Sequence, residues 1–340
     1  RLPIPRIRQL LHHFARLTMT PDGCRNGMIR SICRWPHAWK PFVSMRRTLT
    51  TGVRTAGLAA LTCVAVAVLF ATCPPLPQPL KYHDFADQRC LCCGVPNTAD
   101  VLSNAPFLLV SAIGLDHILG GTALGALGLG HVLGAPVFAD RAVELPLWIT
   151  FFLGVGLVAL GSGYYHWRPD NARLVWDRLP MTIGFMALLA VVLTDTVIEA
   201  TAEATNATLG VLITLGLASV VWWARYDDLR PYVLVQFYSL FLVPLLLALF
   251  PSRYDGANAE IVTALAFCKR SSSLGPFFET LNEATTLCTD AGAKITEGLD
   301  KPIFKLTRGC VSGHTLKHLL SGVATFWGTV ILLRRRERVV

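Results

Sequence analysis

The sequence predicts an all-α, polytopic membrane protein, with a bundle of seven transmembrane helices preceded by one extra apolar segment. The first indication is composition: 53% of the 340 residues are hydrophobic and 16% are charged, whereas soluble domains carry about 25% charged residues. The second is a series of apolar runs, each near the ~20 residues that a membrane-spanning helix needs. The third is the presence of a basic stretch at each end of the chain, before the first apolar run and after the last.

The N-terminal stretch 1–54 is strongly basic. It holds eleven Lys and Arg residues and one acid, Asp22, which gives +10, so the remaining residues sum to −1 within a total of +9. The basic character therefore belongs to this tail, and the rest of the chain shows no nucleic-acid recognition motif. We expect no nucleic-acid partner, and we interpret 1–54 as a disordered or targeting tail. Residues 1–44 could instead be sequence upstream of the true start, since Met45 offers a new one.

An apolar segment at 55–73 follows the basic tail and resembles a signal anchor or signal peptide. If it stays in place, Arg46, Arg47 and Arg54 hold its N-terminal end in the cytoplasm by the positive-inside rule. Prolines directly after Cys73 end the run, because proline does not continue a helix without cost.

Further apolar runs predict the helices of the main domain, residues 80–333. They lie at 101–119, 145–165, 179–198, 209–224, 232–250 and 316–333. The Gly- and Ala-rich piece 122–138 is too weak for a span and is expected to be a loop. Another crossing is expected within 259–307, interrupted by a polar, Ser/Thr-rich insertion at 268–290.

Charge sets the direction of these crossings. The basic C-terminal tail 334–340 contains Arg334, Arg335 and Arg336 and should be cytoplasmic, like Arg47. The number of crossings must then be even, and the first run, the six later runs and one crossing in 259–307 give eight. This count places the end of 145–165 and the start of 316–333 at one face, the non-cytoplasmic face.

The residues at that face predict a metal site. Ser162 and His166 are spaced i,i+4, as are His314 and His318, so each pair shares a helix face, and Asp177 is expected to open the next helix. Three neutral histidines with one open position are typical of catalytic zinc, with Asp177 as proton acceptor and Ser162 as hydrogen-bond donor to an oxyanion. The simpler alternative is that the histidines only hydrogen-bond water at the interface.

A second polar group precedes the first helix of the domain. Asp84 and Asp87, then Asn97 and the polar positions of 97–104, offer the carboxylates and amides that calcium prefers. The alternative is a solvated loop with helix capping by Asn97 or Asp100. The sequence leaves both interpretations open.

Four stretches carry a resemblance to the alkaline ceramidase family, closest to its bacterial members. They are Asp84 to Asp87 with 97–104, GSGYYHWRPDNARLVWDRLP at 161–180, DDLRPYVLVQFY at 227–238 and SGHTLKHLL at 312–320. The resemblance covers about 80–333. The spacing from Ser162 to His166 to Asp177, with His314 and His318 near the C-terminus, is the most specific part.

The resemblance implies a zinc site of His166, His314 and His318, with Asp177 handling the proton of water and Ser162 supporting the oxyanion. The implied reaction is hydrolysis of the ceramide amide, with the lipid entering from the bilayer. It also implies calcium near Asp84 and Asp87, although Asn97 stands where a Glu ligand is expected and Arg89 where an Asn ligand is expected.

Two other functions are compatible with the same residues. One is hydrolysis of a different lipid amide or ester, and the other is a receptor-like or metal-binding membrane protein with little turnover. The expected location is a multi-pass position in a bacterial inner membrane or a eukaryotic internal membrane.

Overall fold

The structure is a computed structural model in which the chain divides into two units, Arg1–Thr48 and Leu49–Val340. All described residues belong to the second unit. They are 51–92, 94–121, 138–198, 200–250, 252–255, 293, 295–334 and 336–337. The predicted tail 1–54, up to residue 50, and the predicted insertion 268–290 lie outside the described residues.

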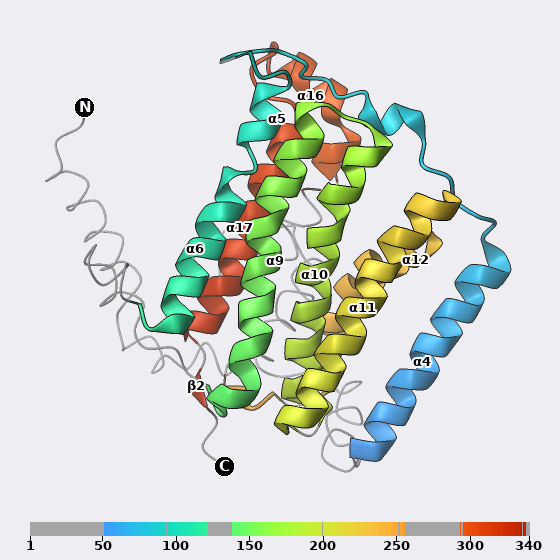
Figure 1. Cartoon of the computed structure of the whole chain (residues 1–340), viewed down its shortest axis with the longest axis vertical. Coiled ribbons are helices and arrows are strands. Elements are labelled where there is room, and N and C mark those ends of the chain that lie inside the picture. The colour runs from blue at the N-terminus through green and yellow to red at the C-terminus, as the bar shows by residue number, and fades with distance from the viewer. Residues whose placement is uncertain are drawn as a thin grey trace, which may run out of the picture. The chain divides into compact units, whose positions relative to one another are not determined.

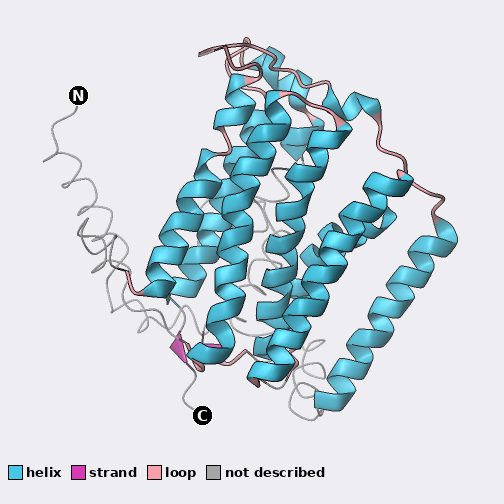
Figure 2. Ribbon diagram, viewed as in Figure 1, coloured by secondary structure: helices cyan, strands magenta, loops and turns pink. Residues whose placement is uncertain are grey.

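The second unit is helical, as Figure 2 shows, with one pair of two-residue antiparallel strands, β1 (Tyr254–Asp255) and β2 (Arg336–Glu337). The short helical elements are η3 (Leu80–His83), α5 (Thr98–Leu102), α12 (Arg230–Val233), η4 (Leu234–Tyr238), a π-helical turn, and α16 (Asp300–Leu306). The longer helices are α4 (Thr51–Thr72), α6 (Ala105–Leu119), α9 (Arg141–Trp167), α10 (Asn171–Thr196), α11 (Ala202–Tyr226), α13 (Ser239–Leu249) and α17 (Gly313–Arg334).

Six helical stretches in the described part of the chain are long and apolar enough to cross a membrane. They are Gly52–Thr72, Thr98–Leu119, Arg141–Trp167, Asn171–Thr196, Ala202–Tyr226 and Arg230–Leu247. The all-α class and the membrane location are thus supported. The count of seven helices stays a prediction. The 22-residue α17 is not among the six, and most of 259–307 lies outside the described residues. Residues 122–137 of the expected loop 122–138 lie outside them too.

The apolar segment expected at 55–73 forms α4. None of its apolar window is buried within the protein. It contacts the rest of the unit at a few points, including the Thr62 hydroxyl against the Tyr238 hydroxyl at 2.9 Å and Arg230 over the Phe70 ring. A helix that is apolar and so little covered by protein suits a lipid environment. Its role as a signal anchor stays a prediction.

Helices α9 and α10 form the central pair of the unit, and α6 and α11 pack against them. The two central helices approach closely because glycines face backbone. A Cβ on Gly154 would lie 2.8 Å from the backbone nitrogen of Gly184, and a Cβ on Gly161 would overlap the carbonyl oxygen of Trp176. The second contact lies next to Ser162, so it brings a predicted site residue against α10.

Helix α10 begins earlier than expected. We expected the run to start at 179 with Asp177 opening the helix. The structure instead starts α10 at Asn171, with Asp170 as N-cap accepting a hydrogen bond from the Arg173 backbone N–H at 2.8 Å. An N-cap carboxylate satisfies one of the free N–H groups at a helix start. Asp177 therefore lies inside the second turn of α10, on a fixed helical backbone.

The elements that carry the predicted site residues meet at one end of the helices. Figure 1 shows α5, α16, the start of α17, the end of α9 and the start of α10 at the upper end of the view. α17 lies beside α6 and α5. The predicted convergence of the two histidine segments is confirmed. On which side of a membrane this end lies stays a prediction.

We expect Gly161→Ala to lower the thermal unfolding midpoint of the protein in detergent. The added methyl group would meet the Trp176 carbonyl, which is backbone and does not rotate away, and overpacking typically costs about 1–3 kcal/mol. Gly163→Ala is the matched control in the same turn, because the nearest atom, Val101 Cγ1, would be 4.0 Å from its Cβ. Equal midpoints for the two variants would contradict this account of the α9–α10 contact.

Candidate metal centre

Three buried histidines converge where α9 ends and α17 begins. His166, His314 and His318 are 1%, 3% and 4% exposed. Their candidate ligand atoms all lie within 4.8 Å of one another. Among the described residues, no other group of three or more His, Cys, Asp or Glu side chains has this arrangement. The two i,i+4 relations predicted from the sequence thus produce one compact cluster.

The spacing of this cluster suits a metal ion. The Nε2 atoms of His166 and His314 are 3.3 Å apart, and two ligands bound to one ion at 2.0–2.1 Å with a tetrahedral angle between them lie about 3.3 Å apart. Imidazole nitrogens bind several transition-metal ions, zinc among them. The structure supports a metal site, and zinc as the ion stays a prediction.

A serine hydroxyl fixes the tautomer of His318. Ser103 Oγ donates its hydrogen to the Asp100 carbonyl at 2.9 Å, so it accepts a hydrogen bond from His318 Nδ1 at 2.8 Å. A donating Nδ1 leaves Nε2 without a hydrogen, as a metal ligand requires. The sequence places Ser103 among the candidate calcium ligands of 97–104. Its position in the helical break after α5 instead directs it to the histidine.

The start of α17, which carries His314, is held by three acceptors. Ser312 Oγ accepts from the Thr315 backbone N–H at 3.0 Å, as an N-cap residue does. Asp300 Oδ1 accepts from the His314 N–H at 2.8 Å. Asp100, completely buried, accepts from the Thr315 hydroxyl at 2.6 Å. These contacts tie the first turn of α17 to α5 and α16.

Ser162 and Asp177 lie together beside this cluster. Ser162, one turn before His166 on α9, is 2% exposed, and its hydroxyl hydrogen-bonds to the Asp177 carboxylate of α10. The close approach at Gly161 allows this contact between the two helices. Both residues therefore lie beside the histidines, although Asp177 does so from inside α10 and not from the start of the helix. Their catalytic roles stay predictions.

Charged residues surround Asp177, and their positions there are not predicted from the sequence. Lys317, Arg178 and Glu297 all act electrostatically on its carboxylate. Lys317 Nζ pairs with Glu297 Oε1 at 2.8 Å, and both side chains are largely buried. Lys317 lies between His314 and His318 in a helix that is expected to enter the membrane. Ionisable groups at that depth are usually functional or paired, so this lysine is the feature of the sequence that could have indicated a charged partner.

Arg178 is held in an aromatic cage. Its guanidinium lies 4.1 Å from the Trp223 ring centroid and 4.7 Å from that of Tyr232, and its Nη2 donates to Gln78 Oε1 at 2.6 Å. Cation–π contacts stabilise a desolvated guanidinium. The cage therefore keeps a positive charge next to Asp177 within the apolar bundle.

Phe85 covers the outer side of the histidines. Its ring centroid lies 4.7 Å from that of His166 and 4.4 Å from that of His314, and the side chain is 6% exposed. No role for Phe85 is predicted from the sequence, because a single aromatic residue in a loop carries no periodic signal. Its position keeps water away from one side of the cluster.

The candidate calcium residues do not share a site. Asp87 pairs with Arg89 and Asp84 pairs with Lys301. The Asn97 amide Nδ2 donates to the His166 carbonyl oxygen at 2.8 Å. Each side chain has a different partner from within the protein, so the three do not form the oxygen cage that calcium needs. Asn97 instead ties the loop to the end of α9.

The sequence matches no protein-family model and no curated protein. The likeness to the alkaline ceramidase family therefore stays a prediction based on the residues described above.

We expect Ser103→Ala to weaken zinc binding by about 10- to 100-fold, the usual effect of removing a hydrogen-bond partner of a metal-ligating histidine. The measurement is competition of the purified protein with a zinc chelator of known affinity. Ser111→Ala is the control. The Ser111 hydroxyl of α6 is also buried, but it donates to the backbone carbonyl of Phe152 in α9 at 2.7 Å and not to a histidine. Unchanged affinity in Ser103→Ala would show that the His318 tautomer does not depend on Ser103.

Proposed function

We propose that the protein is a zinc-dependent membrane amidase that hydrolyses the amide bond of ceramide or a similar lipid amide, releasing a sphingoid base and a fatty acid. The observation that carries the proposal is the convergence of His166, His314 and His318 with the paired Ser162 and Asp177. A ligand set, a proton acceptor and a hydroxyl donor are the groups that metal-assisted hydrolysis of an amide requires.

His166, His314 and His318 would hold the zinc ion. When bound there, zinc would supply Lewis-acid chemistry and lower the pKa of water to about 7. Ser103 keeps the ligand nitrogen of His318 free of hydrogen. Phe85 restricts entry of bulk water from its side, which strengthens electrostatic interactions inside the site.

Asp177 would accept a proton from the attacking water and deliver it to the nitrogen of the leaving amine. Its position inside α10 and its hydrogen bond from Ser162 fix the direction of the carboxylate. Once Asp177 carries a proton, the Ser162 hydroxyl is released from its role as donor to a carboxylate. Its hydrogen can then turn towards the negative oxygen that develops on the substrate carbonyl.

The depth of the site suits a lipid amide. His166 is one residue from the end of α9, and His314 is the second residue of α17. The centre therefore lies near the end of α9, which is long and apolar enough to span a membrane, and near the start of α17. The amide of a two-chain lipid in a bilayer also lies near the level of the headgroups. The substrate would therefore reach the site sideways from the bilayer. The charge pattern of the sequence favours the non-cytoplasmic face.

The decisive test is incubation of the purified protein with ceramide labelled in its acyl chain. We expect wild type to release labelled fatty acid, and His314→Ala and Asp177→Asn to lose at least about 100-fold, as for other acid–base and ligand residues. Asp170→Asn is the matched control, because Asn also caps a helix and Asp170 lies outside the site.

Metal content separates the competing functions. Zinc in the wild type without release from ceramide, other lipid amides or esters would favour a receptor-like protein and contradict the hydrolase. Equal release by wild type, His314→Ala and Asp177→Asn would refute the assigned roles.

A further inference from the structure

The segment from Asp84 to Arg89 carries Phe85 against the metal centre and ties itself to α16 and α17. The Ala86 backbone N–H donates to Asp300 Oδ2 at 2.8 Å, and the other oxygen of Asp300 accepts from the His314 N–H. One carboxylate thus joins the segment that holds Phe85 to the turn that holds His314. The partners of Asp84 and Asp87 hold this segment in place, so they also affect the position of Phe85 at the metal centre.

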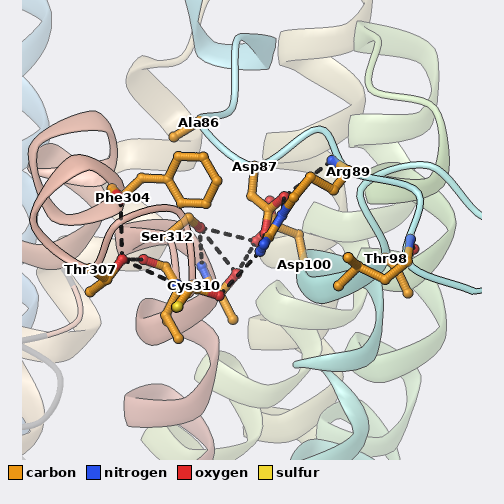
Figure 3. Close-up of polar contacts among 12 residues, drawn as sticks. Ala86, Asp87, Arg89, Thr98, Asp100, Phe304, Thr307, Cys310 and Ser312 are labelled. Carbon is orange, nitrogen blue, oxygen red and sulfur yellow. Dashed lines mark hydrogen bonds and ion pairs between the residues drawn. The ribbon is translucent and has the colours of Figure 1, made fainter.

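Arg89 binds both carboxylate oxygens of Asp87. Its Nε donates to Oδ1 at 2.8 Å and its Nη2 donates to Oδ2 at 2.6 Å, and Asp87 is completely buried. The same Nη2 donates to the Cys310 carbonyl at 3.1 Å, and the guanidinium lies 5.2 Å from the Phe304 ring centroid. Figure 3 shows Arg89 reaching between Asp87 and Cys310, with Asp100 and Ser312 close by.

The Asp87–Arg89 pair is chemically complete without a metal. A buried carboxylate needs a partner of opposite charge, and a planar guanidinium binds carboxylates in this two-point manner. Burial alone would raise the pKa of Asp87, but the hydrogen bonds and positive charge of Arg89 hold that pKa below its usual value. Calcium takes six to eight oxygen ligands, and here both Asp87 oxygens are already bound to nitrogen.

We propose that Arg89 is a built-in cation that occupies the role expected of calcium, and that it fixes the Phe85 segment to the start of α17 without a metal ion. Lys301 plays the lesser part at Asp84, where both side chains are more than half exposed and the pair is correspondingly weak. Arg89 is a positioning residue: it acts on His314 through the Cys310 carbonyl and on the histidine rings through Phe85. The proposal does not depend on the centre being catalytic.

The first test is a calorimetric titration of zinc-loaded wild-type protein with calcium. We expect no binding up to millimolar calcium and no change in the unfolding midpoint. Stoichiometric calcium binding by the wild type would overturn the proposal, and this result does not depend on whether any variant folds.

The second test uses Arg89→Asn and Arg89→Lys. We expect Arg89→Asn to lower the unfolding midpoint by several degrees and to weaken zinc binding about tenfold, as loss of outer contacts to a metal site does. Arg89→Lys should fall between wild type and Arg89→Asn, because lysine keeps the charge and loses the two-point contact.

Arg173→Ala is the matched control, since Arg173 also pairs with an aspartate, but Asp170 is 42% exposed whereas Asp87 is fully buried. Wild-type midpoint and zinc affinity in Arg89→Asn would overturn the positioning role.

Discussion

The close approach of α9 and α10 at Gly161 is the constraint on which the centre depends. Because no side chain separates Gly161 from the Trp176 carbonyl, Ser162 of one helix reaches Asp177 of the other. The same turn of α9 presents His166 four residues later, on the face that Ser162 shares. One small residue at a helix contact thus sets the relation between the hydroxyl, the carboxylate and the first histidine, and α17 completes the cluster from the other side.

Partners for buried polar groups explain much of the surrounding structure. Ser103 accepts from Nδ1 of His318, and the Thr315 hydroxyl donates to Oδ1 of Asp100. Ser312 and Asp300 accept from backbone N–H groups in the first turn of α17. Each contact joins a different pair of elements, and within an apolar bundle each would be costly to leave unmade. The break between α5 and α6 is therefore useful, because it lets Ser103 and Asp100 face the centre instead of continuing a regular apolar helix.

The fold class and the histidine cluster could be predicted from the sequence, because they follow from apolar run length and from i,i+4 spacing, which are local properties. The charge count also predicts His166 and the His314/His318 pair at one end of the bundle, and the structure brings the three histidines together. The roles of Ser103, Phe85 and Arg178 could not be predicted, since each depends on contacts between segments far apart in the sequence. The start of α10 was misplaced because its first turn is polar, and only the capping by Asp170 reveals it.

The balance of charge around Asp177 gives the centre its chemical character. Two cations, Lys317 and Arg178, act on this carboxylate together with one further acid, Glu297. These four side chains sum to zero formal charge, and Lys317 is already paired with Glu297. Three neutral histidines add no charge, whereas the Asp100 and Asp300 carboxylates accept hydrogen bonds from the first turn of α17, beside His314. A divalent ion held by the histidines would therefore lie between the two carboxylates near α17 and the two cations near Asp177. A cation in a low-dielectric site stabilises an anion that forms next to it, so Lys317 and Arg178 are the groups that would support the oxyanion of the proposed amide hydrolysis.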